Sequence, residues 1–318
     1  MALSGLWRLP AAVRGALAFL TRLPVGGGAA GWDAFRRTPA SFPLAGYVVG
    51  ALLAVPFGLS GLLAGVGVDL PAASTAALYL LAVYGLTGVA HADGLADLAD
   101  AAAVHERADE GGVDGEDAGA GDHASGARGT GDAPGDPARE RRRAVLKDSR
   151  TGVGGVLAVA AAVAALVLGA LGLAQLVHGG PVGGAAPGAG AWAAAGSWAA
   201  VATVVAAEVG AKAGMGLLAC LGSPAHEGLG SQLVGESDGR GLVGVAAASL
   251  PAVLLAGAAP VAVGVLGLGV LAGPLVALAV RRWASARLGG VSGDAFGAAN
   301  ELGRVAALHV GVIAWALA

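Results

Sequence analysis

The stretch GVGGVLAVAAAVAALVLGALGLAQLV, residues 152–177, contains no charged side chain. A helix needs about 20 predominantly apolar residues to cross the hydrocarbon core of a bilayer, so this stretch is long enough to span a membrane. Further apolar runs cover residues 42–66, 72–90, 192–221, 241–257, 260–280 and 302–317. We therefore expect an all-α, polytopic membrane protein with about seven transmembrane helices.

The overall composition supports this class. The 318 residues are 56% hydrophobic and 13% charged, with a mean hydropathy of +0.71. A typical soluble domain is about 45–50% apolar and about 25% charged. The composition excludes a soluble enzyme, a disordered protein and a nucleic-acid binder, and a net charge of −3 creates no strong field toward nucleic acid. The single cysteine, Cys220, excludes a disulfide scaffold and a cysteine-based metal site.

The positive charges predict an orientation in the bilayer. Nearly all lysines and arginines fall in four segments, residues 1–40, 91–151, 222–240 and 281–301. The intervening polar segments hold none; these are residues 67–71, 178–191 and 258–259. Because positive residues are enriched in cytoplasmic loops, we expect a multi-pass protein of the cytoplasmic membrane with its N-terminus and its chemistry facing the cytoplasm. Residues 11–24 are too short to span and are expected at the interface.

We expect one membrane-embedded catalytic domain over residues 1–318, interrupted by an acidic insert at residues 105–137. The insert is rich in Gly, Asp and Glu and has almost no large apolar side chain. Such a segment buries too little surface to offset the entropy of ordering it, which favours disorder. An acidic docking tail is the alternative interpretation.

Three aspartates mark the principal candidate site, in the sequence HADGLADLAD of residues 91–100. On a helix, Asp93, Asp97 and Asp100 share one face, where like charges repel one another unless a cation neutralises them. Carboxylates without Cys or His partners suit Mg²⁺. The alternative is a helix end solvated by headgroup water and arginine. His91 is expected roughly opposite Asp93, as a catalytic group or as a hydrogen-bonded boundary histidine.

A second candidate site precedes the stretch at residues 152–177. Lys147, Ser149 and Arg150 are followed by Gly152 and a helix N-terminus, a combination suited to binding phosphate. Asp148 adds a further candidate carboxylate for the metal. Positive-inside anchoring with a helix cap is the alternative.

Later segments add charged and glycine-rich features. Glu208 and Lys212 lie four residues apart within an apolar run, where charges usually pair or serve a site. Two turn-rich loops, residues 224–230 and 289–301, lie on the same predicted membrane face. The candidate residues of these loops are Glu227, Asp294, Asn300 and Glu301. Their convergence on one face is what an active site at a membrane surface requires.

These residues suggest a metal-assisted transfer of a phosphate-bearing group onto an alcohol. Membrane CDP-alcohol phosphotransferases use this chemistry, but their signature DG-x2-AR-x8-G-x3-D-x3-D is absent. A transporter would place its charges near the bilayer midplane and usually show repeated halves, whereas the acids here gather at one face. Both classes remain alternatives.

The order of six motifs resembles the cobalamin synthase family, the adenosylcobinamide-GDP ribazoletransferases (cobalamin 5′-phosphate synthases). The motifs are Phe19–Pro24, Phe42–Gly46, His91–Asp100, Lys147–Gly152, Glu227–Gly230 and Gly293–Glu301. The resemblance implies a multi-pass enzyme that uses Mg²⁺, joins adenosylcobinamide-GDP to α-ribazole or its 5′-phosphate, and releases GMP. A homo-oligomer or an association with other corrinoid enzymes is a further possibility.

Combined with this resemblance, the motifs assign roles to the candidate residues. The metal ligands are expected to be Asp93, Asp97, Asp100 and Asp148. Substrate and phosphate contacts are expected from Lys147, Ser149, Arg150, Gly152, Lys212, Glu227, Asp294, Asn300 and Glu301. The proton acceptor stays open between a carboxylate and His91. The chain departs from the family pattern at Ala101, where glycine is usual, at Lys212, where arginine is usual, and in the insert.

Overall fold

The computed structural model describes residues 8–104, 137–146, 150–177, 189–257 and 259–318, and these residues form helices joined by turns without any β-strand. The N-terminal half contains α2 (Leu9–Leu20), α3 (Gly28–Arg36), α4 (Ser41–Leu53), α5 (Val55–Gly65), α6 (Ala72–Thr87), α7 (Ala90–Ala103) and α8 (Pro137–Val145). The C-terminal half contains α9 (Val153–Val177), α10 (Ala189–Leu221), α11 (Leu229–Leu233), α12 (Gly241–Ser249), the 3₁₀ helix η1 (Leu250–Ala256), α13 (Pro260–Arg287) and α14 (Gly293–Ala316). The all-α prediction is confirmed.

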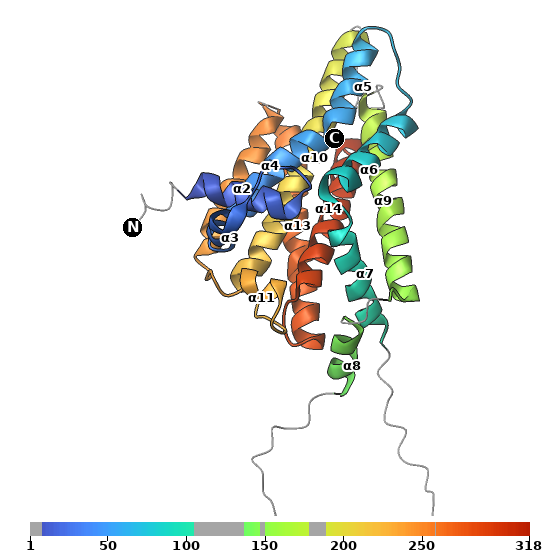
Figure 1. Cartoon of the computed structure of the whole chain (residues 1–318). Helices are drawn as coiled ribbons and strands as arrows, with labels where there is room; N and C mark the ends of the chain where they lie inside the picture. Colours follow the sequence, from blue (N-terminus) through green and yellow to red (C-terminus); the bar gives the residue numbers. More distant parts are fainter. Residues whose placement is uncertain (1–7, 105–136, 147–149, 178–188, 258) are drawn as a thin grey trace, which may run out of the picture.

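Helix α10 forms the centre of the bundle and contacts α4, α5, α9, α13 and α14 (Figure 1). Small residues allow these close approaches, as is usual between membrane helices. A Cβ atom added at Gly210 of α10 would lie 2.7 Å from the Val270 carbonyl oxygen of α13. One added at Gly46 of α4 would lie 2.8 Å from the Cα atom of Val209. Most of α10 is therefore buried within the protein.

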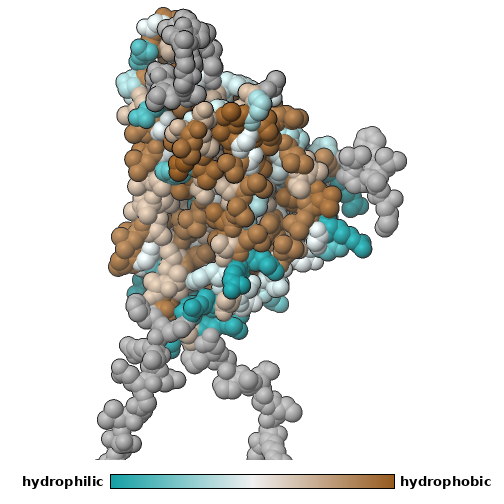
Figure 2. All heavy atoms as spheres, turned by 180° about the vertical axis from the view of Figure 1, so that it is seen from behind, coloured by the Kyte–Doolittle hydropathy of each residue, from teal (hydrophilic) through white to brown (hydrophobic). Residues whose placement is uncertain are grey.

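The outer helices present apolar side chains to the surroundings. Figure 2 shows a broad apolar surface around the middle of the molecule, with polar residues gathered toward one end. Large exposed hydrophobic residues include Leu62, Leu81, Leu157, Leu268 and Leu271. A soluble protein rarely exposes apolar patches of this extent, whereas lipid covers such a surface in a bilayer. The chain is a membrane protein.

The number of candidate spans is smaller than expected. Among the described residues, four helical segments are long and apolar enough to cross a membrane: Ser41–Gly65, Val153–Val177, Gly196–Leu221 and Pro260–Arg287. The pair α6 and α7 gives a fifth if it is counted as one broken span. The prediction of about seven spans is therefore not confirmed.

Three of the expected spans differ for physical reasons. The run at 72–90 ends at Gly88, whose positive φ of 70° allows a 91° bend between α6 and α7. The run at 241–257 is divided into α12 and η1 near Pro251, and the combined helix is short. The run at 302–317 belongs to α14, where polar residues such as Glu301 and Arg304 reduce the hydropathy. Helix α2 is also short, as expected.

Candidate active site

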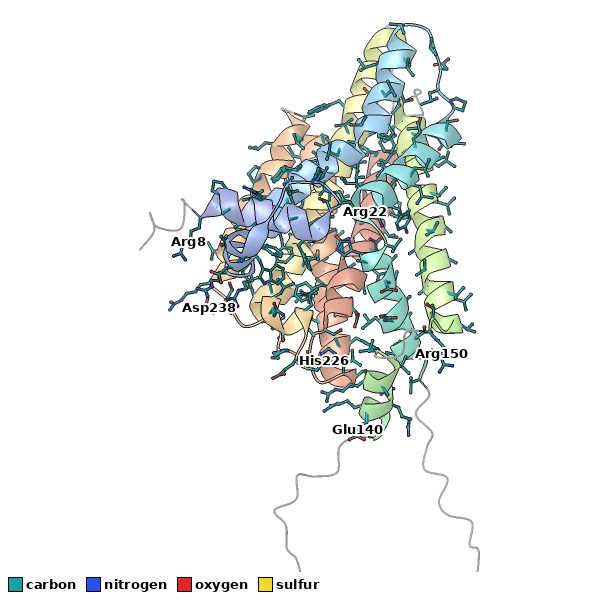
Figure 3. The ribbon with its side chains drawn as sticks, viewed as in Figure 1. Arg8, Arg22, Glu140, Arg150, His226 and Asp238 are labelled. Atoms are coloured by element: carbon teal, nitrogen blue, oxygen red, sulfur yellow. The ribbon has the colours of Figure 1, made fainter. Side chains whose placement is uncertain are left out.

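Several motifs that are distant in sequence meet at one end of the bundle. In Figure 1, α8, the far end of α7, the start of α9, α11 and the turn between α13 and α14 lie at this end, and Figure 3 places His226, Glu140 and Arg150 there. The two turn-rich loops pair directly: the Val291 N–H donates to the Ser223 carbonyl (2.7 Å) and the Ala225 N–H donates to the Val291 carbonyl (3.1 Å). The loops expected to converge therefore do so.

Glycines bring α7 against the start of α14. A Cβ atom added at Gly94 would lie 2.9 Å from the Cα atom of Asp294, and one added at Gly297 would lie 2.9 Å from the His91 carbonyl oxygen. Real Cβ atoms do not approach other atoms so closely, so any larger residue would separate the helices. This contact places Asp294 beside the aspartates of α7.

Carboxylates from α7 and α14 face one another at this contact. Asp97 is partly buried and is repelled by the charges of Asp294, Asp93 and Asp100. Burial raises the pKa of the Asp294 carboxyl above its ordinary value, and the negative charge of Asp93 raises it further, while the hydroxyl of Ser292 opposes the rise by donating a hydrogen bond to Oδ2 (3.1 Å). Groups of carboxylates with disfavoured charged forms are candidates for functional sites.

Asp100 differs from its neighbours because its carboxylate caps α9. Its Oδ2 accepts a hydrogen bond from the Gly152 N–H (2.6 Å) and its Oδ1 accepts one from the Gly155 N–H (2.8 Å). These are N–H groups that lack partners within the helix, and a carboxylate also interacts favourably with the helix dipole. The donors expected to bind phosphate at Gly152 are thus engaged by Asp100 in this arrangement.

The rest of the predicted phosphate-binding segment is described only in part. Lys147, Asp148 and Ser149 lie outside the described residues. The insert also lies outside them, except for Pro137, which begins α8. Arg150 is exposed just before α9, and Glu227 is exposed in the loop that packs against the start of α14.

The donor chemistry fits a hard divalent cation that shares its ligands with a substrate. Within the described residues, no group of three or more His, Cys, Asp or Glu side chains is arranged to hold a metal ion. Mg²⁺ does not require such a cage, because it commonly binds one or two carboxylates together with substrate phosphates and water. Asp93, Asp97 and Asp294 offer carboxylates of this kind, whereas the Asp100 carboxylate is already engaged with α9.

A groove of about 570 Å³ lies beside Asp93, between the α6–α7 segment and α9. Asp93, Thr151 and Tyr84 are its polar residues, and most of the remaining lining is apolar, including Val89, Val156 and other side chains of α9. Its volume falls in the range of small-molecule sites, which are largely apolar with a few polar groups. The groove offers an apolar ring a position next to a carboxylate.

Behind the carboxylates lies a buried cluster of charges that connects α10 to α14. Lys212 and Arg304 both donate to the Glu208 carboxylate, and Arg304 also donates to both oxygens of Glu301 (2.9 and 3.0 Å). All four side chains are almost completely buried. Their charges balance, which is required because an unpaired charge within a membrane protein is very costly. The expected pairing of Glu208 with Lys212 is confirmed.

The charge cluster continues to His91 through Asn300. The Asn300 amide nitrogen lies 3.2 Å from His91 Nδ1 and 3.4 Å from Glu301 Oε1. The sequence predicts substrate contacts from Lys212, Asn300 and Glu301, but the structure buries all three in this network. Buried side chains reach no substrate unless the helices separate, so their partners here are one another.

Sequence reasoning missed Arg304, which pairs with both acids of the cluster. The available signal was the arginine itself, because a charge inside an apolar run usually has a buried partner. It also missed Ser292, which caps α14 by accepting a hydrogen bond from the Ala295 N–H (3.4 Å).

The fold and the site together define a helical membrane protein with facing carboxylates at one end of its bundle. The family model described as cobalamin-5-phosphate synthase matches residues 12–111 and 120–312. The chain belongs to this family, which confirms the resemblance found in its motifs.

Three curated relatives from haloarchaea support the same assignment, and each is named adenosylcobinamide-GDP ribazoletransferase. The relative from Halorubrum lacusprofundi is 44% identical over 96% of this chain and 97% of its own length. The relative from Haloquadratum walsbyi is 38% identical over 96% of this chain and 98% of its own length. The relative from Halobacterium salinarum is 40% identical over 78% of this chain and 97% of its own length. No solved structure matches the chain.

Proposed function

We propose that this chain is a transferase of the cytoplasmic membrane that performs the final step of cobalamin nucleotide loop assembly. It transfers the adenosylcobinamide phosphate moiety from adenosylcobinamide-GDP to α-ribazole, or to α-ribazole 5′-phosphate, and releases GMP. The family match and the shared name of the relatives support this substrate class. The structural observation that carries the proposal is the meeting of Asp93, Asp97 and Asp294 from two helices at one end of the bundle.

The proposed reaction is a substitution at phosphorus. The oxygen of the acceptor hydroxyl forms a bond to the phosphorus nearer the corrinoid, and the bond from this phosphorus to the bridging oxygen breaks. GMP leaves with that oxygen and its electron pair, while the hydroxyl proton passes to a base. Mg²⁺, when bound, neutralises charge on the pyrophosphate.

The chain's own residues divide the remaining tasks. Asp93, Asp97 and Asp294 would hold the cation, and Arg150 and Lys147 would counter the negative charge that grows on GMP. The apolar groove beside Asp93 suits the aromatic base of α-ribazole, which would bring the acceptor hydroxyl toward the carboxylates. The active site would face the cytoplasm, in agreement with the distribution of lysine and arginine.

A reconstituted assay tests this function. The purified full chain, in liposomes with Mg²⁺, adenosylcobinamide-GDP and α-ribazole, is expected to produce GMP and a cobalamin in equal amounts. A CDP-alcohol with an alcohol acceptor serves as the matched comparison and should give no product. Product from the CDP-alcohol alone would contradict the proposal and favour the alternative phosphotransferase.

A further inference from the structure

Asn300 occupies a position that decides where His91 carries its proton. Its amide nitrogen lies within hydrogen-bonding distance of two groups, His91 Nδ1 at 3.2 Å and Glu301 Oε1 at 3.4 Å. Both Asn300 and Glu301 are fully or almost fully buried, and His91 is only 8% exposed. Water therefore has little access to change these partners.

The carboxylate fixes the orientation of the amide. Arg304 donates to both oxygens of Glu301, so Glu301 is ionised and can only accept hydrogen bonds. The Asn300 atom that faces it must then be the NH₂ group. The opposite orientation would place two oxygens against each other and leave both N–H donors without these acceptors, which costs more than the single unpartnered Oδ1 of the observed arrangement.

The tautomer of the histidine follows from the amide. Because the Asn300 NH₂ group donates to His91 Nδ1, this nitrogen must be an acceptor and carries no proton. A neutral imidazole then carries its proton on Nε2. Such a ring donates a hydrogen bond from Nε2 and cannot accept a proton there.

The rest of the charge cluster keeps Glu301 in place. Arg304 bridges Glu301 and Glu208, and Lys212 completes the charge balance on the far side of Glu208. The chain of contacts thus runs from α10 through α14 to the first turn of α7, where His91 lies next to the carboxylate-bearing face.

We propose that Arg304, Glu301 and Asn300 are positioning residues that hold His91 as the neutral tautomer with its proton on Nε2. Its role in the reaction rests on the proposed function: His91 donates a hydrogen bond from Nε2 to a phosphate oxygen of the substrate, and a carboxylate takes the proton of the acceptor hydroxyl. This assigns the two candidate groups to different tasks.

Nitrogen-15 NMR of the ring nitrogens tests the tautomer without reference to activity. The purified full chain is labelled with ¹⁵N-histidine, and His91 is assigned by the signals that disappear in His91→Gln. We expect a proton on Nε2 in the unmodified protein and a mixture of tautomers in Asn300→Leu, which has similar size but no donor. Thr203→Val removes a buried hydrogen bond elsewhere, to the Ala199 carbonyl, and should leave the His91 signals unchanged.

A proton on Nδ1 in the unmodified protein would overturn the proposal, and this result needs no variant to fold. An unchanged tautomer in a folded Asn300→Leu protein would also overturn it, because the amide would then not set the proton.

A pair of substitutions tests the role of His91 in the reaction. The amide nitrogen of Gln reaches the position of imidazole Nε2, whereas that of Asn reaches the position of Nδ1. His91→Gln should therefore lower GMP release by less than about 10-fold, and His91→Asn by roughly 10² or more, the scale of a lost proton-transfer or donor group. Equal losses in both variants would contradict the donor role. Absence of GMP release in the unmodified protein would contradict the proposed function and would leave the NMR result intact.

Discussion

Asp100 stabilises the start of α9 because its two carboxylate oxygens accept hydrogen bonds from two backbone N–H groups of that segment. The contact joins residues 52 positions apart in the sequence. It also keeps α7 beside the first turn of α9, where the groove next to Asp93 begins. One aspartate of the HADGLADLAD motif therefore supports the architecture of the site, while its neighbours face Asp294.

Asp100→Ala is expected to destabilise the protein, since both backbone donors lose their acceptor. Loss of a capping side chain costs about 1 kcal/mol of unfolding free energy, within a range of about 0.5–2 kcal/mol. Asp100→Asn retains one acceptor oxygen and should cost less. Thermal unfolding in detergent measures both, with Asp93→Ala at an exposed aspartate as the control. An Asp100→Ala protein as stable as the unmodified one would contradict the capping role.

The sequence could predict that three aspartates share a helix face, but not that one of them caps a different helix. The spacing of residues 93, 97 and 100 records only local geometry, whereas the partners of Asp100 follow the insert. The same limit applies to Arg304. Its neighbour Glu301 lies three residues away, but its second partner, Glu208, is 96 residues distant and belongs to another helix.

At the scale of elements, the bend between α6 and α7 directs the aspartates toward α14. The apolar run at 72–90 predicts one straight span because hydropathy does not record a change of direction. Gly88, with its positive φ, is the local feature that permits the break in this run. Loop pairing is easier to anticipate, because both turn-rich segments are predicted on the same membrane face.

Gly94→Ala is expected to separate α7 from α14, since its Cβ atom would meet the backbone of Asp294. Overpacking of this kind costs about 1–3 kcal/mol of stability. Displacement of the carboxylates by about 1 Å should lower GMP release on the order of 10²-fold. Gly85→Ala on α6 is the control, because a Cβ atom there meets nothing within 4 Å. Equal activity of the two variants would contradict the importance of the contact.

At the scale of the whole molecule, composition is sufficient to predict a helical membrane protein, but not the number of spans. An apolar run can be a lipid-facing helix, a short helix such as α12, or part of a buried helix such as α10. Composition does not distinguish these environments. Family membership could be predicted because six motifs occur in order. The contribution of Lys147, Asp148 and Ser149 stays a prediction, since these residues lie outside the described part.

The orientation predicts opposite accessibility on the two sides of α9. Single cysteines are introduced at Gly184 and at Gly121 in a Cys220→Ala background and are treated with an impermeant thiol reagent on intact cells. Gly184→Cys should react and Gly121→Cys should react only after the membrane is permeabilised. The reverse pattern would place the aspartates outside the cell, away from cytoplasmic nucleotides, and would contradict the proposed mechanism.

The most direct test of the proposed metal-assisted transfer is the dependence of Asp97→Asn on Mg²⁺. Asparagine keeps the size of the side chain but removes a charge that faces Asp294 and Asp93. If these carboxylates hold Mg²⁺ for transfer, GMP release should fall by roughly 10² or more and should recover in part as Mg²⁺ is raised, while the unmodified enzyme is already saturated. If Asp97 belongs only to a solvated helix end, relief of like-charge repulsion leaves the variant folded and active. A fully active Asp97→Asn enzyme with an unchanged response to Mg²⁺ would contradict a metal-binding role for these carboxylates.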